Sequence, residues 1–178
     1  MTIFTVGHST HPIGEFIGIL QAHGVKKLID VRTVPKSRHN PQFNGDALAA
    51  SVRASGITYR RMESLGGLRH ARKDSPNGAW RNASFRGYAD YMQTEEFSAA
   101  IDQLLDRGRA NDSAIMCAEA VPWRCHRQLV SDTLVARGIE VLHVVGAAEN
   151  PHRLTAFARI DGDRVVYDRA GQPPLPGT

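Results

Sequence analysis

Short β-prone runs alternate with amphipathic segments between residues 3 and 145, and this alternation constrains the fold more than any other feature. The first run, Ile3–Val6, stops at Gly7 and precedes a segment that places apolar side chains on one helical face. Strands separated by helices pair in parallel, and the helices then cover both faces of the sheet. The sequence therefore predicts an α/β fold with three layers (αβα) and a mainly parallel central sheet of about five strands.

Several of the expected helices also carry a local signal at one or both ends. Asn44 and Thr94 are suited to begin helices, whereas Gly24, Gly56 and Gly138 are suited to end them. The expected strands cover residues 3–6, 27–31, 57–59, 113–116 and 141–145. The expected helices cover residues 12–20, 44–52, 85–92, 94–105 and about 124–137.

The remaining segments have weaker patterns. Residues 157–160 and 165–167 are β-prone and flank an Asp-Gly turn signal, which predicts a C-terminal β-hairpin. The connection from Glu63 to Ser84 is long for an ordinary loop, and we expect it to act as a mobile lid. Residues 1–169 are expected to form a single α/β domain, and the Pro- and Gly-rich residues 170–178 a flexible C-terminal tail.

Polar side chains follow three of the expected strands. Ligands of open α/β sheets bind beyond the carboxyl ends of the strands, so these side chains are expected to meet at one edge. They are His8 and Ser9 after the first run, Asp30 and Arg32 at the end of the second, and Cys117 and Glu119 after the fourth. Convergence from three strands predicts a functional site there.

Cys117 is the candidate nucleophile of this site. A thiol between a strand end and a helix N-terminus, near several arginines, is expected to have a lowered pKa. The alternative is that Cys117 is a small buried hydrophobic residue. Cys125 is expected either to resolve an oxidised Cys117 or to pack on the helix.

An anion-binding region is expected beside Cys117. Arg124, His126 and Arg127 combine positive side chains with the free N–H groups at the start of the expected helix. The loop after the second strand is expected to contribute further contacts, from Arg32, Ser37 and Arg38. The alternative for these loop residues is ordinary turn formation around two prolines.

The acids and His8 have less specific roles. Asp30 and Glu119 lie near arginines, so each is expected to orient an arginine or to serve as a general base. His8 either exchanges a proton near Cys117 or caps its turn through the side chain.

A metal site is a further possibility for Cys117, Cys125, His126 and His8, which have suitable donor atoms. The Cys-x7-Cys-His spacing is not that of a zinc knuckle, and Cys125 and His126 on one helix would point about 100° apart. No Walker-type or dinucleotide glycine motif is present either. We therefore expect neither a metal nor another cofactor.

The charge distribution suggests the class of partner. Eleven Lys/Arg face three acids between Arg32 and Arg86, an excess that favours an anionic small molecule or a nucleic acid, although a solvated basic surface is the plainer alternative. In a nucleic-acid-binding module, four aromatic side chains would stack on bases: Trp80, Phe85, Tyr88 and Tyr91. No run approaches the length of a membrane span, and the N-terminus lacks a secretory signal, so no membrane contact and a cytoplasmic location are expected.

Several motifs in order also indicate a family. The chain resembles the bacterial family called domain of unknown function 488 from about Thr2 to Phe157. The motifs are Val6-Gly7-His8-Ser9, Leu28-Ile29-Asp30-Val31-Arg32, Leu65-Gly66-Gly67, Cys117-Ala118-Glu119 and Cys125-His126-Arg127. The resemblance implies an α/β fold and no established activity. A more distant similarity to rhodanese domains implies that Cys117 matches their catalytic cysteine, although the loop here is longer and contains Pro122-Trp123.

Together these patterns predict an anion-binding, cysteine-dependent enzymatic site for a phosphate-like or sulfur-oxyanion group. A nucleic-acid-binding module is the alternative, and a cluster that only stabilises the fold is a third interpretation.

Overall fold

A computed structural model describes residues 1–108 and 110–169, so the tail expected at 170–178 lies outside the described residues. The strands are β1 (Thr2–Gly7), β2 (Lys27–Asp30), β3 (Thr58–Arg61), β4 (Ser113–Cys117), β5 (Glu140–Val145), β6 (Ala148–Pro151), β7 (Arg159–Asp161) and β8 (Arg164–Val166). The α-helices are α1 (Ile13–Ala22), α2 (Gly45–Ala54), α3 (Ala83–Tyr91), α4 (Glu95–Gly108) and α5 (Arg127–Ala136). Three short 3₁₀ turns are η1 (Pro41–Phe43), η2 (Glu63–Leu65) and η3 (Pro122–Arg124).

The main sheet has the order β3-β2-β4-β1-β5-β6 and is parallel except for β6, which pairs antiparallel with β5. The mainly parallel α/β fold predicted from the sequence is confirmed. The sixth strand was not expected, because all four residues of β6 are exposed and carry no hydrophobic pattern. A turn with Gly146 at a positive φ of 61° joins it to β5.

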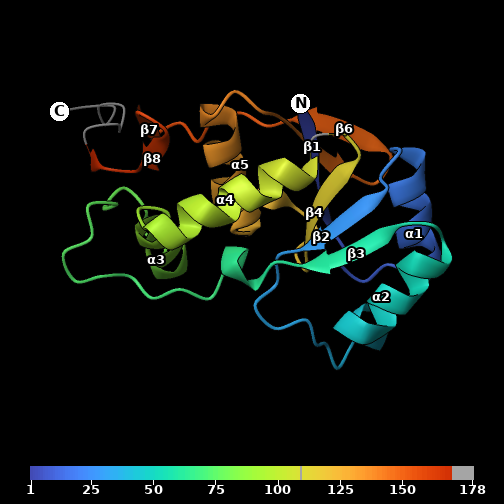
Figure 1. Cartoon of the computed structure of the whole chain (residues 1–178). Helices are drawn as coiled ribbons and strands as arrows, with labels where there is room; N and C mark the ends of the chain where they lie inside the picture. The colour runs from blue at the N-terminus through green and yellow to red at the C-terminus, as the bar shows by residue number, and fades with distance from the viewer. Residues whose placement is uncertain (109, 170–178) are drawn as a thin grey trace.

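Helices cover both faces of this sheet, as Figure 1 shows. Neighbouring strand residues point to opposite faces, so Leu28 packs with the α1 and α2 side, whereas Ile29 packs with the side of α3, α4 and α5. On the first side Phe16 and Leu20 of α1 are buried, as the apolar face of this segment predicts. The hairpin β7–β8 forms a separate two-stranded sheet, as the Asp-Gly signal predicts.

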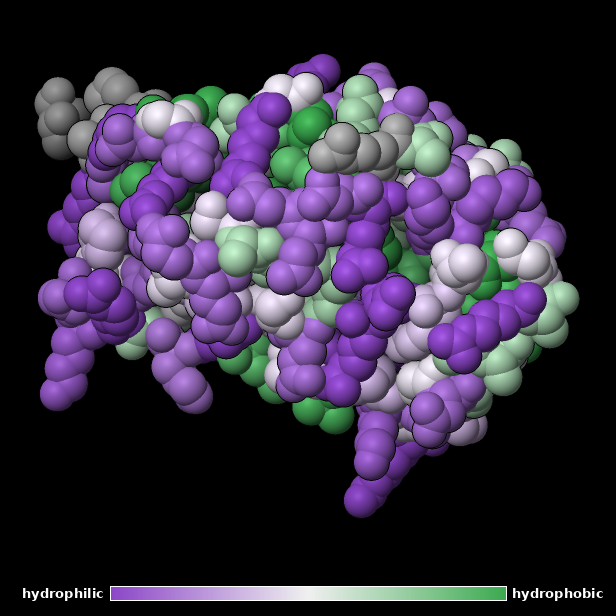
Figure 2. Space-filling view, in the orientation of Figure 1, coloured by the Kyte–Doolittle hydropathy of each residue, from purple (hydrophilic) through white to green (hydrophobic). Residues whose placement is uncertain are grey.

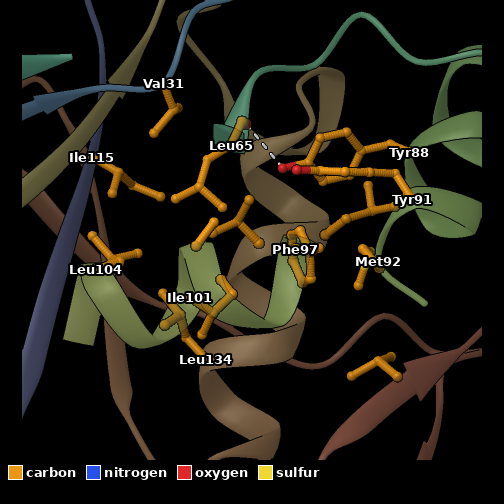
Figure 3. Close-up of a cluster of buried hydrophobic side chains, with 14 of the residues drawn as sticks. Val31, Leu65, Tyr88, Tyr91, Met92, Phe97, Ile101, Leu104, Ile115 and Leu134 are labelled. Carbon is orange, nitrogen blue, oxygen red and sulfur yellow. Dashed lines mark hydrogen bonds between the residues drawn. The ribbon is translucent and has the colours of Figure 1, made fainter. Parts of the chain in front are cut away.

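The segment from Glu63 to Ser84 is attached to α3 and to the core beneath it. Tyr88 donates a hydrogen bond to the Leu65 carbonyl at 2.9 Å from within the cluster shown in Figure 3. The buried carboxylate of Asp90 accepts from the Arg72 backbone N–H at 2.8 Å and from the Asn77 side chain at 2.8 Å. These contacts hold the segment against α3, and its motion as a lid stays a prediction.

Helix α5 begins at Arg127 and not at about residue 124, where the sequence pattern placed its start. Pro122 begins the 3₁₀ turn η3, and Cys125 then has extended backbone angles (φ −136°, ψ 149°). His126 occupies the position before the first helical residue. Cys125 and His126 therefore lie on a bend before the helix, not on its surface.

A buried chain of hydrogen bonds joins α5 to β5 and β1. Asp132 accepts from His152 Nε2 at 2.9 Å, so His152 Nδ1 is unprotonated and accepts from His143 Nε2 at 2.9 Å. His143 Nδ1 in turn accepts from the Thr5 hydroxyl at 2.7 Å. The chain requires a neutral His143. Burial lowers the pKa of His143 to about 4, and repulsion from Arg127 and from His152 in its protonated form adds to this effect, against the attraction of Asp132.

This network predicts acid sensitivity of folding. As the pH falls below about 6.5, His143 becomes protonated in the unfolded chain. In the folded protein it stays neutral down to about pH 4, so protons favour the unfolded chain in this range. The contribution of His143 is therefore complete above about pH 6.5 and declines as the pH falls toward 4, by on the order of 2 kcal/mol. Urea unfolding across this range should show a smaller pH slope in His143→Gln than in the wild type. The exposed residue His39 offers a control, because His39→Gln should keep the full slope; equal slopes in both variants would contradict the assignment.

The outer surface is predominantly polar in the view of Figure 2, where hydrophobic residues are visible as separate small areas among hydrophilic ones. Among the described residues, no helix combines the length and the apolar character needed to cross a membrane.

Candidate functional site

A cavity of about 610 Å³ opens beyond the carboxyl ends of β2 and β4. Short segments of the chain line it: residues 32–34 after β2, 67–68 of the long connection, residues 82, 84 and 85 at the start of α3, 117–119 after β4, and 123–126 before α5. The cavity therefore lies at the sheet edge where the sequence places the site.

Two free cysteines and a histidine meet in the cavity lining. Cys117 at the end of β4 and Cys125 on the bend before α5 are both buried, and their sulfur atoms and a ring nitrogen of His126 all lie within 4.8 Å of one another. His126 Nδ1 is 3.6 Å from the Cys125 sulfur. The two thiols are close enough to influence each other's ionisation, so the two cysteines form an interacting pair.

Arg127 is buried next to this pair and does not contribute to the lining, in contrast to the expected anion contact. Its side chain is only 1% exposed. The guanidinium donates to the backbone carbonyl of Glu119 and, through Nε, to the Cys125 sulfur at 3.5 Å. A buried cation that donates to a sulfur stabilises the thiolate form of that sulfur.

Of the two thiols, Cys125 is the one whose pKa is lowered. Interaction with the Cys117 thiol lowers the pKa of Cys125 well below its usual value, against burial, with His126 and Arg127 adding to the effect. The same interaction and burial raise the pKa of the Cys117 thiol. The lowered pKa expected for Cys117 is therefore wrong, because Cys117 keeps its proton and Cys125 is the thiol that ionises more readily.

Arg32 is held at the cavity wall by buried partners. Asp30 accepts from Arg32 Nε at 2.9 Å and from Nη2 at 2.5 Å, and also from the Tyr59 hydroxyl at 2.8 Å. Burial opposes the charge of Arg32, but these Asp30 bonds outweigh it and raise the pKa of the guanidinium. Asp30 was expected either to orient an arginine or to act as a general base. Its contacts match the first role, because they orient Arg32.

His8 completes this cluster from the turn after β1. Its Nδ1 lies 2.8 Å from the Ser9 carbonyl, which only accepts, so Nδ1 carries the proton and Nε2 accepts from Arg32 Nη1 at 3.1 Å. Burial lowers the pKa of His8 to about 4, and its ring stacks on Phe43 at 4.2 Å. Both ring nitrogens are engaged, so His8 supports Arg32, and no contact joins its ring to the Cys117 thiol among the described residues.

Two glycines allow the segments of the site to approach closely. A Cβ on Gly7 would lie 1.8 Å from the Glu119 carbonyl oxygen, because the loop after β4 passes directly over it. A Cβ on Gly67 would lie 2.4 Å from His126 Nδ1, so the glycine backbone fixes one side of the histidine ring. These contacts give the glycine-containing motifs a steric role in the site.

The other predicted residues occupy different places. Glu119 and Arg124 are exposed and contribute to the cavity lining, together with His126. Ser9 has a positive φ of 47° and lies in a neighbouring hollow of about 360 Å³, which Arg32, Ser37 and Glu119 also line. Arg38 lies in a third hollow, beside Lys36 and Asp46, and not in the cysteine cavity.

Apolar side chains around the cavity were not identified from the sequence as site residues. Val34, Leu68 and Trp123 line it while exposing 58%, 72% and 64% of their surfaces. Large hydrophobic side chains rarely gather at a single exposed place without a binding role. Their positions in loops left no periodic signal in the sequence.

The aromatic residues expected to stack on nucleic acid do not form an exposed surface. Tyr88 and Tyr91 are buried in the core, and Trp80 packs against Phe85 and Phe157 with ring centroids 4.9 Å away in both cases. The expected stacking by Tyr88 and Tyr91 is therefore wrong, and nucleic-acid binding by the rest of the basic segment stays a prediction.

The bend before α5 also changes the expectation about metals. The divergence of Cys125 and His126 on a helix was one of the two grounds, with the Cys-x7-Cys-His spacing, for expecting no metal site. On the bend, their donor atoms instead converge with Cys117, so these three residues form a set able to hold a metal ion.

Comparison with known proteins gives one result. A family model described as "Domain of unknown function DUF488" matches residues 12–134. No curated protein and no solved structure matches the chain significantly.

Proposed function

Because the chain belongs to the DUF488 family, whose description names no activity, we propose from the cavity itself that the protein is a cysteine-dependent enzyme acting on a small anion. The observation that carries this proposal is the Cys125 sulfur in the cavity lining, which accepts a hydrogen bond from Arg127 Nε and lies next to the Cys117 thiol. Donors of this kind are how proteins prepare a sulfur nucleophile.

The surroundings of the pair favour a ligand with a negative charge. Arg124 is exposed at the cavity, and no described residue pairs with it. The N-terminus of α3 also borders the cavity through Asn82, Ser84 and Phe85. Asn82 caps the Ser84 and Phe85 N–H groups, and the positive end of the helix dipole still favours an anion. A phosphate-like or sulfur-oxyanion group satisfies both features.

The remaining wall favours an apolar portion in the same ligand. Leu68, Trp123 and Val34 would cover such a portion while Arg124 contacts the charge. Small-molecule sites typically combine an apolar lining with a few polar groups that fix orientation.

In the proposed reaction, the Cys125 thiolate forms a bond to an electrophilic atom of the ligand as the leaving group departs. The Cys117 thiol gives its proton to the leaving group, so a covalent Cys125 adduct and a Cys117 thiolate remain. Glu119, exposed at the cavity, is placed to exchange protons with water. We place the protein in the reducing cytoplasm, where both thiols remain free.

Alkylation of the two cysteines tests the proposal. Iodoacetamide at neutral pH should modify Cys125 first, and at least about tenfold faster than N-acetylcysteine. Iodoacetate has the same reacting carbon but carries a carboxylate. The ratio of the iodoacetate rate to the iodoacetamide rate at Cys125 should therefore exceed the same ratio for N-acetylcysteine by about three- to tenfold. Peptide mass spectrometry identifies the modified residue.

Matched variants separate the two parts of the proposal. Arg124→Gln should remove most of the preference for iodoacetate, whereas Arg53→Gln, an exposed change on α2, should leave it intact. Preferential labelling of Cys117 would refute the assignment of the nucleophile. A rate ratio equal to that of N-acetylcysteine would refute anion binding.

A further inference from the structure

We infer that Cys117, Cys125 and His126 form a binding site for a thiophilic divalent cation such as Zn²⁺, and that bound metal blocks the thiol chemistry. The blocking effect rests on the proposed function, whereas metal binding itself does not. Two thiolates and one imidazole are a ligand set that Zn²⁺ accepts in proteins.

The spacing of the donor atoms carries the inference. All three donor atoms lie within 4.8 Å of one another, and His126 Nδ1 is 3.6 Å from the Cys125 sulfur. A tetrahedral ion about 2.3 Å from sulfur and about 2.0 Å from nitrogen would separate those two donors by about 3.5 Å. The observed separation therefore matches two donors that share one ion.

The chain holds these donors in place without a metal. Cys117 ends the central strand β4, and the 3₁₀ turn η3 sets the extended conformation of Cys125. Gly67 packs against the ring of His126 so closely that a methyl group in its place would overlap the ring. A site that is already arranged loses little conformational freedom on binding its ion.

Hydrogen bonding also leaves His126 available. Its Nδ1 contacts only the Cys125 sulfur, and its buried Nε2 has no hydrogen-bond partner among the described residues. Nothing described therefore competes with a metal for this ring. Arg127 also donates to the Cys125 sulfur, as donors around metal-bound thiolates commonly do.

Three protein ligands leave one tetrahedral position vacant. The three ligand residues also line the cavity, so this position is filled by water or by a bound anion. Zinc coordination uses the sulfur lone pairs that a nucleophilic attack requires. Metal binding and the thiol reaction therefore exclude each other.

Metal titration tests the inference on the full chain. After removal of metals with a chelator, the protein should bind one Zn²⁺ per chain, measured by competition with a chromophoric chelator. Co²⁺ in the same site should give the sulfur-to-cobalt charge-transfer band of a thiolate complex. Saturating Zn²⁺ should slow alkylation of Cys125 by at least about tenfold.

Variants identify the ligands. His126→Gln and Cys125→Ser should each weaken Zn²⁺ binding by at least about tenfold, whereas His39→Gln, at an exposed histidine, should not change it. His126→Gln retains both thiols, so it separates loss of the ligand set from loss of the cysteine pair. Equal Zn²⁺ affinity in His126→Gln and the wild type would overturn the three-ligand site.

The two proposals fail in different ways. Absence of stoichiometric Zn²⁺ binding, with rapid carboxylate-sensitive alkylation retained, would reject the metal site and leave the proposed function standing. Tight Zn²⁺ binding without preferential alkylation of Cys125 would reject the proposed function and the blocking effect, and would leave the metal site standing.

Discussion

Asp30→Ala is expected to lower the free energy of unfolding by roughly 3–5 kcal/mol, a large fraction of the stability of a protein of this size. Asp30 is completely buried and is the only carboxylate bound to the buried Arg32 guanidinium among the described residues. Its removal leaves an uncompensated buried charge and deprives the Tyr59 hydroxyl of its acceptor. Equilibrium urea unfolding measures the effect.

A surface ion pair provides the control for this prediction. Asp74 bonds Arg72 through the same two guanidinium nitrogens, but both side chains are exposed. Asp74→Ala should leave the unfolding midpoint unchanged within error, because exposed ion pairs contribute little. Similar losses in Asp30→Ala and Asp74→Ala would show that burial of the Asp30–Arg32 pair has no special importance.

Gly7→Ala should have the second large effect, by displacing the loop that follows β4. The new methyl group would lie 1.8 Å from the Glu119 carbonyl oxygen and 2.8 Å from the Ala120 Cα, both backbone atoms that cannot rotate away. Overpacking of this kind is expected to lower the free energy of unfolding by about 3 kcal/mol or more. Because Arg127 bonds the same carbonyl, the displacement should also reduce the rate of Cys125 alkylation.

Gly18→Ala is the matched control. Gly18 lies inside α1, and no atom lies within 4 Å of the position that an alanine methyl group would take, so alanine should raise the free energy of unfolding by about 0.5–1 kcal/mol. Thermal unfolding and alkylation rates of the two variants can be compared directly. A folded Gly7→Ala with unaltered Cys125 reactivity would contradict the proposed contact between the loop and β1.

Much of the fold was predictable because hydrophobic periodicity reports burial directly. The runs that became β1, β2 and β4 are apolar and buried, and the carboxyl ends of these strands do meet at the site. Strand β6 was not predictable, because its residues are exposed and its pairing with β5 depends on the preceding turn. Periodicity therefore identified the central strands but missed an edge strand.

The position of the cavity at the carboxyl edge of the sheet was predictable, but the contacts of its lining residues were less so. Residue types alone cannot show that Arg127 points inward and donates to Cys125, or that the Arg32 guanidinium is hydrogen-bonded to Asp30 and His8. The choice between the two thiols depends on Arg127, which donates to the Cys125 sulfur and not to that of Cys117. The start of α5, three residues later than expected, changed the expectation about metals, because Cys125 and His126 then lie before the helix.

The central position of β1 affects how the protein can be divided experimentally. Strand β1 lies between β4 and β5, with Gly7 directly opposite Cys117, and His8 and Ser9 donate backbone hydrogen bonds to the carbonyls of Cys117 and Ala118. The family match starts at residue 12 and ends at 134, so it includes neither β1 nor β5. A fragment trimmed to the matched region would lose a middle strand of the sheet and leave the edge of β4 unpaired. Expression of that region alone should therefore give an aggregating polypeptide, and studies of the cysteine pair need the residues on both sides of the match.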